Sequence, residues 1–157
     1  MKNDQALRKH VLALLTEGDA HLKFDAAVDK LPHELRGKRP KGAAHSPWEL
    51  LEHLRIAQWD ILEFSRDPKH VSPEFPEGYW PKQPGPANEK AWDDSVAAFH
   101  KDLKAMANLV ADASVDLLAP IPHADGKTLL REALVLADHN SYHLGQLVLT
   151  RQLLGAA

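Results

Sequence analysis

The chain has 157 residues with a net charge of −3 when its ten histidines are neutral, and 44% of the residues are hydrophobic. This length predicts a single domain over residues 1–157 with a core large enough to fold alone. The acidic balance argues against a nucleic-acid partner, and no apolar run approaches the roughly 20 residues of a membrane span. The chain has no cysteine, which excludes disulfides, thiolate metal ligands and a cysteine nucleophile. Its charged start has no signal-peptide core, so we expect a cytoplasmic protein without a membrane partner.

Hydrophobic periodicity predicts four helices. The first covers 4–30, and Gly18 within it is interpreted as a point of close approach to another helix. The second covers 47–66, because Ser46 and Glu49 have the spacing of a capping box with a proline at the first helical position. The third covers 88–112 and the fourth 128–155, the latter ending at a glycine typical of a helix C-terminus.

The connection between the second and third helices is long and rich in proline. Residues 67–87 hold six of the eleven prolines together with Phe75, Tyr79 and Trp80. These aromatic residues argue against a disordered tether, so we expect a strap packed along or over the helices. No segment alternates with a period of two. The predicted fold is therefore all-α, a four-helix bundle with long crossover connections.

Three of the ten histidines take apolar positions on the inward stripes of predicted helices. They are His53 in the second helix and His139 and His143 in the fourth, the latter pair one turn apart on one face. Random placement would already give about 0.6 pairs at this spacing, so position on the stripe is the informative feature. The remaining histidines lie on polar helix faces or in loops.

Three buried imidazoles are difficult to satisfy with one another, because each neutral ring carries a single donor. A divalent transition metal would accept all three lone pairs, while each second nitrogen donates to a nearby oxygen, and it would keep a coordination position open. The alternative is that each histidine is satisfied separately by a neighbour or lines a wet groove. The pattern predicts a metal site made by His53, His139 and His143.

Several residues beside these histidines are candidates for supporting roles. Glu49, Glu52 and Asp138 are the acidic residues nearest in sequence and could accept from a ligand ring or transfer protons. Gln146 could face the same pocket, although an interhelical hydrogen bond is its simpler interpretation. Gly145 lowers helix stability, so a closely approaching neighbour is expected there.

The two histidine-bearing segments resemble the DinB/YfiT-like superfamily of metal-binding four-helix bundles. The resemblance rests on Ser-Pro-Trp-Glu-Leu-Leu-Glu-His-Leu at 46–54 and His-Asn-Ser-Tyr-His-Leu-Gly-Gln-Leu at 139–147. Leu144 replaces an arginine that is frequent in the family, and Tyr142 stands where many members have another histidine.

The resemblance implies an up-down-down-up bundle, a homodimer, and a divalent ion (zinc, nickel, iron or manganese) on His53, His139 and His143. A few relatives use low-molecular-weight thiols in S-transfer or isomerisation. We therefore expect a metal-dependent enzyme acting on a small molecule, of a hydrolase or thiol-dependent S-transferase type. The alternative is a non-catalytic metal- or ligand-binding module of a stress response.

Overall fold

A computed structural model describes residues 2–18 and 20–156. Its five α-helices, in chain order, are α1 (Lys2–Thr16), α2 (Phe24–Val28), α3 (Pro47–Arg66), α4 (Glu89–Ala111) and α5 (Leu129–Leu153). The described residues form no strand, and the single isolated bridge pairs Pro120 with Thr128. None of the described helices is long and apolar enough to cross a membrane. The prediction of an all-α fold is confirmed.

The prediction of one long first helix is wrong, because the helix is interrupted after Thr16 and a separate short helix begins at Phe24. Gly18 has a φ of +72°, in the left-handed region that glycine adopts without steric cost. Its N–H donates to Ala13 O, which caps the end of α1. Gly18 therefore ends a helix, and the interpretation of it as a helix–helix contact is also wrong.

The other three helices begin within one residue of the predicted starts. Ser46 accepts from Glu49 N at 3.1 Å while Glu49 accepts from Ser46 N at 2.8 Å, which is the predicted capping box. Asn88 caps α4, and Thr128 caps α5. These side chains satisfy backbone N–H groups that a helix start leaves without an intrahelical acceptor.

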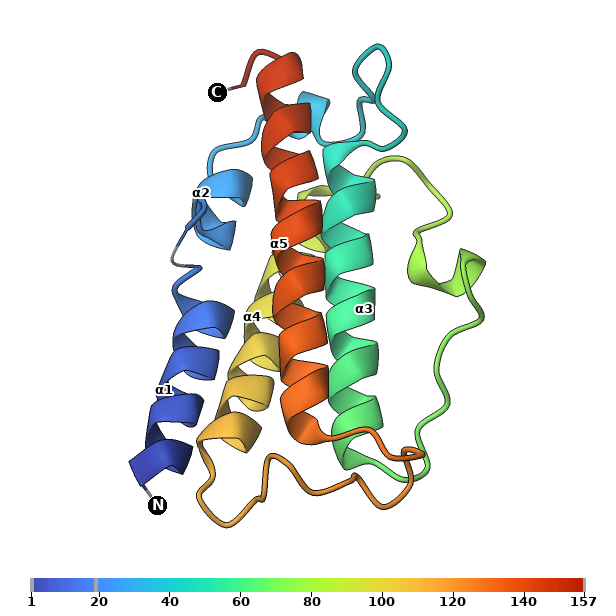
Figure 1. The fold of residues 1–157 in the computed structure, drawn as a ribbon. Coiled ribbons are helices and arrows are strands. Elements are labelled where there is room, and N and C mark those ends of the chain that lie inside the picture. Colours follow the sequence, from blue (N-terminus) through green and yellow to red (C-terminus); the bar gives the residue numbers. More distant parts are fainter. Residues whose placement is uncertain (1, 19, 157) are drawn as a thin grey trace.

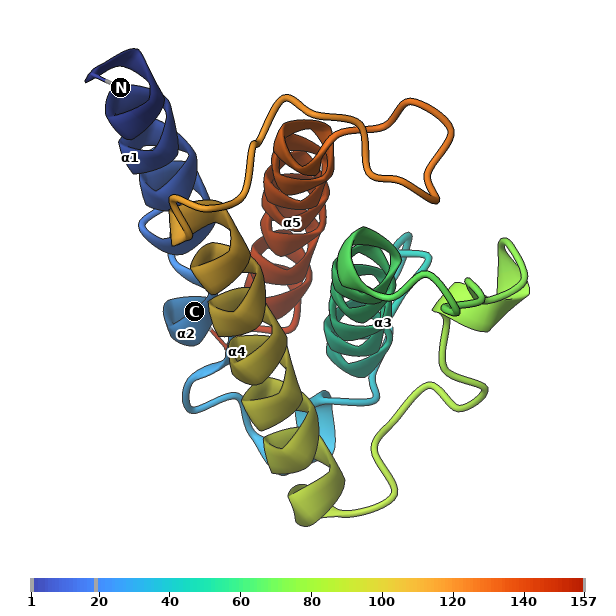
Figure 2. The ribbon, with the colours of Figure 1, turned by 90° about the horizontal axis from the view of Figure 1, so that it is seen from below.

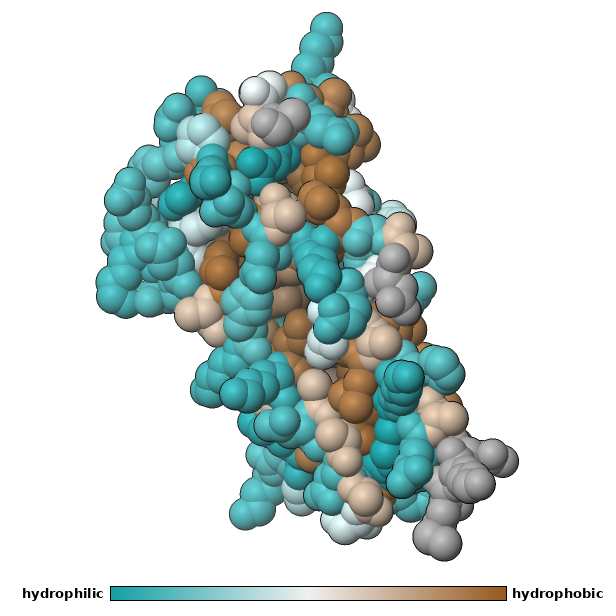
Figure 3. All heavy atoms as spheres, turned by 90° about the vertical axis from the view of Figure 1, so that its left-hand side faces the viewer, coloured by the Kyte–Doolittle hydropathy of each residue, from teal (hydrophilic) through white to brown (hydrophobic). Residues whose placement is uncertain are grey.

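The four long helices pack as a bundle (Figures 1 and 2). In Figure 1, α1 and α5 run upward and α3 and α4 run downward, so the 67–87 strap must cross the length of the bundle to reach α4. α3 packs against α4 and α5, and α1 packs against the same two helices. One core cluster joins α1 and the second half of α3 to α4 and α5, and a second joins α2 and the first half of α3 to the same two helices. On the face that carries α1 and α2, apolar side chains show between hydrophilic ones (Figure 3).

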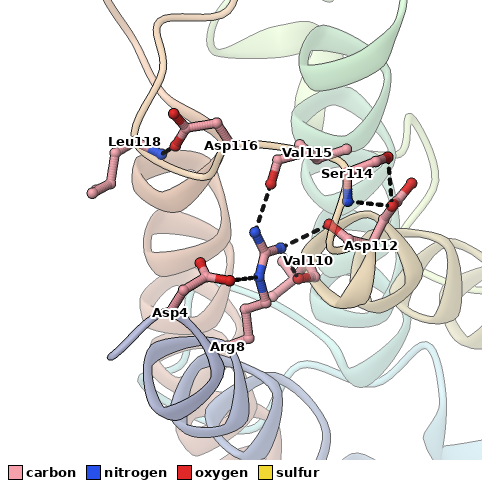
Figure 4. Close-up of polar contacts among 8 residues, drawn as sticks. All are labelled: Asp4, Arg8, Val110, Asp112, Ser114, Val115, Asp116 and Leu118. Carbon is pink, nitrogen blue, oxygen red and sulfur yellow. Dashed lines mark hydrogen bonds and ion pairs between the residues drawn. The ribbon is translucent and has the colours of Figure 1, made fainter. Parts of the chain in front are cut away.

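Arg8 attaches α1 to the end of α4 (Figure 4). Its guanidinium is largely buried and donates to the carbonyl oxygens of Val110, Asp112 and Val115 at 2.6–2.9 Å. Asp4 accepts from Arg8 Nε at 2.9 Å and balances the charge. A helix C-terminus leaves carbonyl groups unpaired and carries partial negative charge, so a buried cation stabilises it.

Candidate metal centre

The three predicted histidines meet between α3 and α5. His53 projects from the middle of α3, and His139 and His143 project from one face of α5. Their ring centroids lie 4.3–4.9 Å apart. His53 is buried, and the other two are partly buried. The predicted grouping of these three residues is therefore present.

The Nε2 atoms of the three rings converge. His53 Nε2 lies 3.1 Å from His143 Nε2 and 3.1 Å from His139 Nε2, and the three candidate ligand atoms lie within 4.8 Å of one another. Two nitrogens bound to one metal at about 2.0–2.1 Å are separated by about 2.8–3.0 Å in octahedral geometry and by about 3.3–3.4 Å in tetrahedral geometry. The spacing is compatible with a shared metal ion.

The second ring nitrogens fix the tautomers of two histidines. His53 Nδ1 donates to the carbonyl oxygen of Tyr79 at 2.9 Å, and His143 Nδ1 donates to Gln146 Oε1 at 2.8 Å. A neutral ring that donates from Nδ1 has only a lone pair on Nε2. In these tautomers two lone pairs face each other across 3.1 Å, an arrangement that a shared cation would stabilise.

His139 differs from the other two histidines. Its Nδ1 is buried and has no hydrogen-bond partner among the described residues, and the same holds for Oδ1 of the adjacent Asn140. An unpaired buried polar group is costly. A metal on Nε2 would use one nitrogen of this ring and would place the proton on the unpaired Nδ1.

Burial keeps the rings in the neutral form that binds metals. Desolvation lowers the pKa of His53 to about 4, and the neighbouring His143 adds to this effect. Desolvation also lowers the pKa of His139 to about 4 and shifts the pKa of His143 in the same direction. At neutral pH the three rings are therefore mainly uncharged, which is the state in which an imidazole binds a metal.

The strap supplies part of the centre's wall. The Trp80 ring stacks on His53 at a centroid distance of 3.9 Å and on His45 at 4.0 Å. Asp60 on α3 holds the segment in place, because it accepts from the Tyr79 hydroxyl at 2.6 Å and contacts His70 Nε2 at 2.7 Å. Neither Trp80 nor His45 had a predicted role at the site. The aromatic residues within a proline-rich segment were the only available signal.

The acidic residues nearest in sequence take other roles. Glu49 belongs to the capping box and pairs with Arg39, while Glu52 pairs with Arg55 and accepts from Ser95. Asp138 is exposed. The interpretation of these carboxylates as acceptors for the histidines is therefore wrong. The backbone carbonyl of Tyr79 in the strap accepts from His53 instead, and the side-chain amide of Gln146 accepts from His143.

The fold and the site define a helical bundle with a three-histidine centre between two of its helices. The chain belongs to the DinB superfamily, whose family model matches residues 18–147 and thus includes all three histidines. Comparison with curated proteins gave no match, and comparison with solved structures gave none either.

Proposed function

We propose that His53, His139 and His143 bind one divalent transition metal ion through their Nε2 atoms. The observation that carries this proposal is the pair of facing lone pairs on His53 and His143, each fixed by a hydrogen bond from Nδ1. Imidazole nitrogen suits zinc, nickel and iron, and manganese remains a fourth candidate.

We further propose that the centre is that of a metal-dependent enzyme acting on a small molecule, either a hydrolase or a thiol-dependent S-transferase. Three protein ligands leave a position for water or for a substrate thiol. A bound cation lowers the pKa of water toward about 7 and favours a thiolate in the same way. Because the chain has no cysteine, the thiol would come from a low-molecular-weight cosubstrate.

The chain's own residues would hold the ligands and shape the approach of the substrate. The Tyr79 carbonyl and the Gln146 amide fix the planes of the His53 and His143 rings. Trp80 covers one face of His53 with an apolar ring and limits water there. Because Asp60 holds the strap through Tyr79 and His70, the position of Trp80 is fixed by α3.

A non-catalytic metal- or ligand-binding module is the second candidate. The observation that favours it is the engagement of Glu49 and Glu52 in other ion pairs, so that neither is placed as a general base at the histidines. Turnover of ester or electrophile panels with added thiol supports the enzyme. Saturable ligand binding without turnover supports the module.

Metal content tests the centre directly. Protein purified without a tag and without added metal is expected to contain about one equivalent of metal by plasma mass spectrometry, and His53→Ala is expected to contain little. His33→Ala, at an exposed loop histidine, is the matched control and should retain the metal. Absence of metal from the wild type after incubation with zinc, nickel or manganese would make the histidines structural.

A further inference from the structure

A cavity lies against a different face of α5 from the one that carries the histidines. It has a volume of about 420 Å³ and is enclosed mainly by α1, α4 and α5. Its wall on α5 is formed by four residues that share one helix face, Ala137, Asn140, Ser141 and Leu144. His139 and His143 project from another face of this helix. α5 therefore separates two independent sites.

The interior of this cavity is apolar. Leu15 of α1, Leu54 of α3, and Phe99 and Leu103 of α4 line it, and Phe24 stacks on Phe99 at a centroid distance of 3.8 Å. The volume falls within the range of small-molecule sites, which are concave and mostly apolar with a few polar groups. Figure 3 faces the side of the molecule that carries α1 and α2, beside which the cavity lies. The body of a fitting ligand is therefore apolar.

Two pairs of polar side chains at the rim are in contact with each other. Lys23 pairs with Glu17 at 2.7 Å, and His100 contacts Asp25 at 2.7 Å. Lys104 also lines the rim, from α4, and no carboxylate of the described part of the chain lies within ion-pair distance of it. The rim thus has one exposed ammonium group available to a ligand.

We propose that this cavity binds an amphipathic carboxylate, with its apolar chain or ring between α1, α4 and α5 and its carboxylate beside Lys104. The apolar interior selects the body of the ligand, and the exposed ammonium group of Lys104 favours an anionic head group. The proposal does not depend on metal binding by the histidines.

Calorimetric titration with decanoate and with decylammonium tests the head group. Decanoate is expected to bind at one site and more tightly than decylammonium. Lys104→Gln should weaken decanoate binding about two- to fivefold, as expected for an exposed ion pair, and added salt should reduce the difference. Lys101→Gln, at an exposed lysine of α4 that does not line the cavity, should change nothing. Equal binding of the two amphiphiles, or no effect of Lys104→Gln, would overturn the assignment of Lys104.

A cavity-filling variant tests the location. Ala107→Phe places a ring in the cavity and should weaken decanoate binding more than tenfold, while Ala111→Phe, at the exposed end of α4, should bind normally. Amide shifts on decanoate addition should cluster in 99–107 and 137–144 and thereby locate the ligand without any substitution. His53→Ala should bind decanoate like the wild type. Absent decanoate binding, or shifts clustered elsewhere, would refute the proposal.

Discussion

Gln146 is the side chain that orients His143, since its Oε1 accepts from His143 Nδ1 at 2.8 Å. Groups that hold a ligand ring in this way commonly contribute 10–100-fold to metal affinity. We expect Gln146→Ala to weaken zinc binding by about that factor, measured by competition with a chelating indicator. Gln152→Ala, at an exposed glutamine of the same helix, is the matched control. Equal affinities of the two variants would remove Gln146 from the site.

Tyr79 supports His53 through its backbone, and its hydroxyl in turn donates to Asp60 at 2.6 Å. Tyr79→Phe keeps the carbonyl acceptor and removes only this anchor. We expect unfolding to become easier by about 1–3 kcal/mol, the range for a hydrogen bond to a charged group, and zinc affinity to fall. Tyr142→Phe, at the exposed second tyrosine, should change stability little; chemical denaturation and zinc titration of both variants provide the comparison.

The grouping of His53, His139 and His143 was predictable from the sequence because these histidines interrupt apolar stripes at helical spacing. Of the groups that hold them, Gln146 had been named as a residue that could face the same pocket, whereas Tyr79 and Trp80 were not predictable. The acceptor from Tyr79 is a backbone oxygen, which no side-chain pattern reports, and Trp80 reaches the site from a segment without periodicity. Proximity in sequence was also a poor guide to the groups that accept from the histidines. Glu49 and Glu52 form ion pairs with Arg39 and Arg55 instead.

At the scale of helices, capping residues and apolar periodicity predicted the starts of α3, α4 and α5 to within one residue. The first helix was predicted too long, because the apolar spacing continues past Gly18 while the backbone there takes a positive φ. A single sequence does not distinguish a glycine inside a helix from one that ends it. The structure resolves this, since Gly18 N–H donates to Ala13 O.

Gly145 lies inside α5, and the expected close neighbour is missing: an added Cβ would meet no described atom within 4 Å. Alanine is favoured over glycine in a helix by about 1 kcal/mol. We therefore expect Gly145→Ala to raise the free energy of unfolding by about 0.5–1 kcal/mol, measured by urea denaturation of the dilute protein.

Gly42 provides the contrast for this variant. An added Cβ there also meets nothing within 4 Å, but φ is +88°. Gly42→Ala should therefore destabilise the protein, because the backbone conformation is unfavourable for an L-residue. If Gly145→Ala also destabilises, then a neighbour outside this chain packs against that face of α5.

At the scale of the whole molecule, the homodimer implied by the family resemblance stays a prediction. We place its contact on the exposed stripe of α5 that includes Tyr142, Leu149 and Leu153, because large apolar side chains there are 54–64% exposed. Leu149→Lys is expected to yield monomers in sedimentation equilibrium. Leu118→Lys, at a similarly exposed leucine of a loop, should retain the wild-type mass. A monomeric wild type would refute the dimer.

The buried histidines make the stability of the metal-free protein depend on pH. Burial lowers the pKa of His53 and of His139 to about 4, while an unfolded chain has histidine pKa values near 6.5. Between these values the unfolded state binds more protons, so lowering the pH favours unfolding. Each ring changes the free energy of unfolding by at most about 1.4 kcal/mol per pH unit, and by less where solvent screens its charge.

We therefore expect the free energy of unfolding of the EDTA-treated protein to fall as the pH is lowered from 6.5 to 5.0, above the range in which most carboxylates titrate. His53→Leu should reduce this slope, and His33→Ala, at an exposed position, should retain it. Saturating zinc should raise stability at pH 6.5 and lose part of its effect toward pH 5.0, since protons and metal compete for the same nitrogens. An equal slope in wild type and His53→Leu would show that this imidazole does not remain neutral in the folded protein.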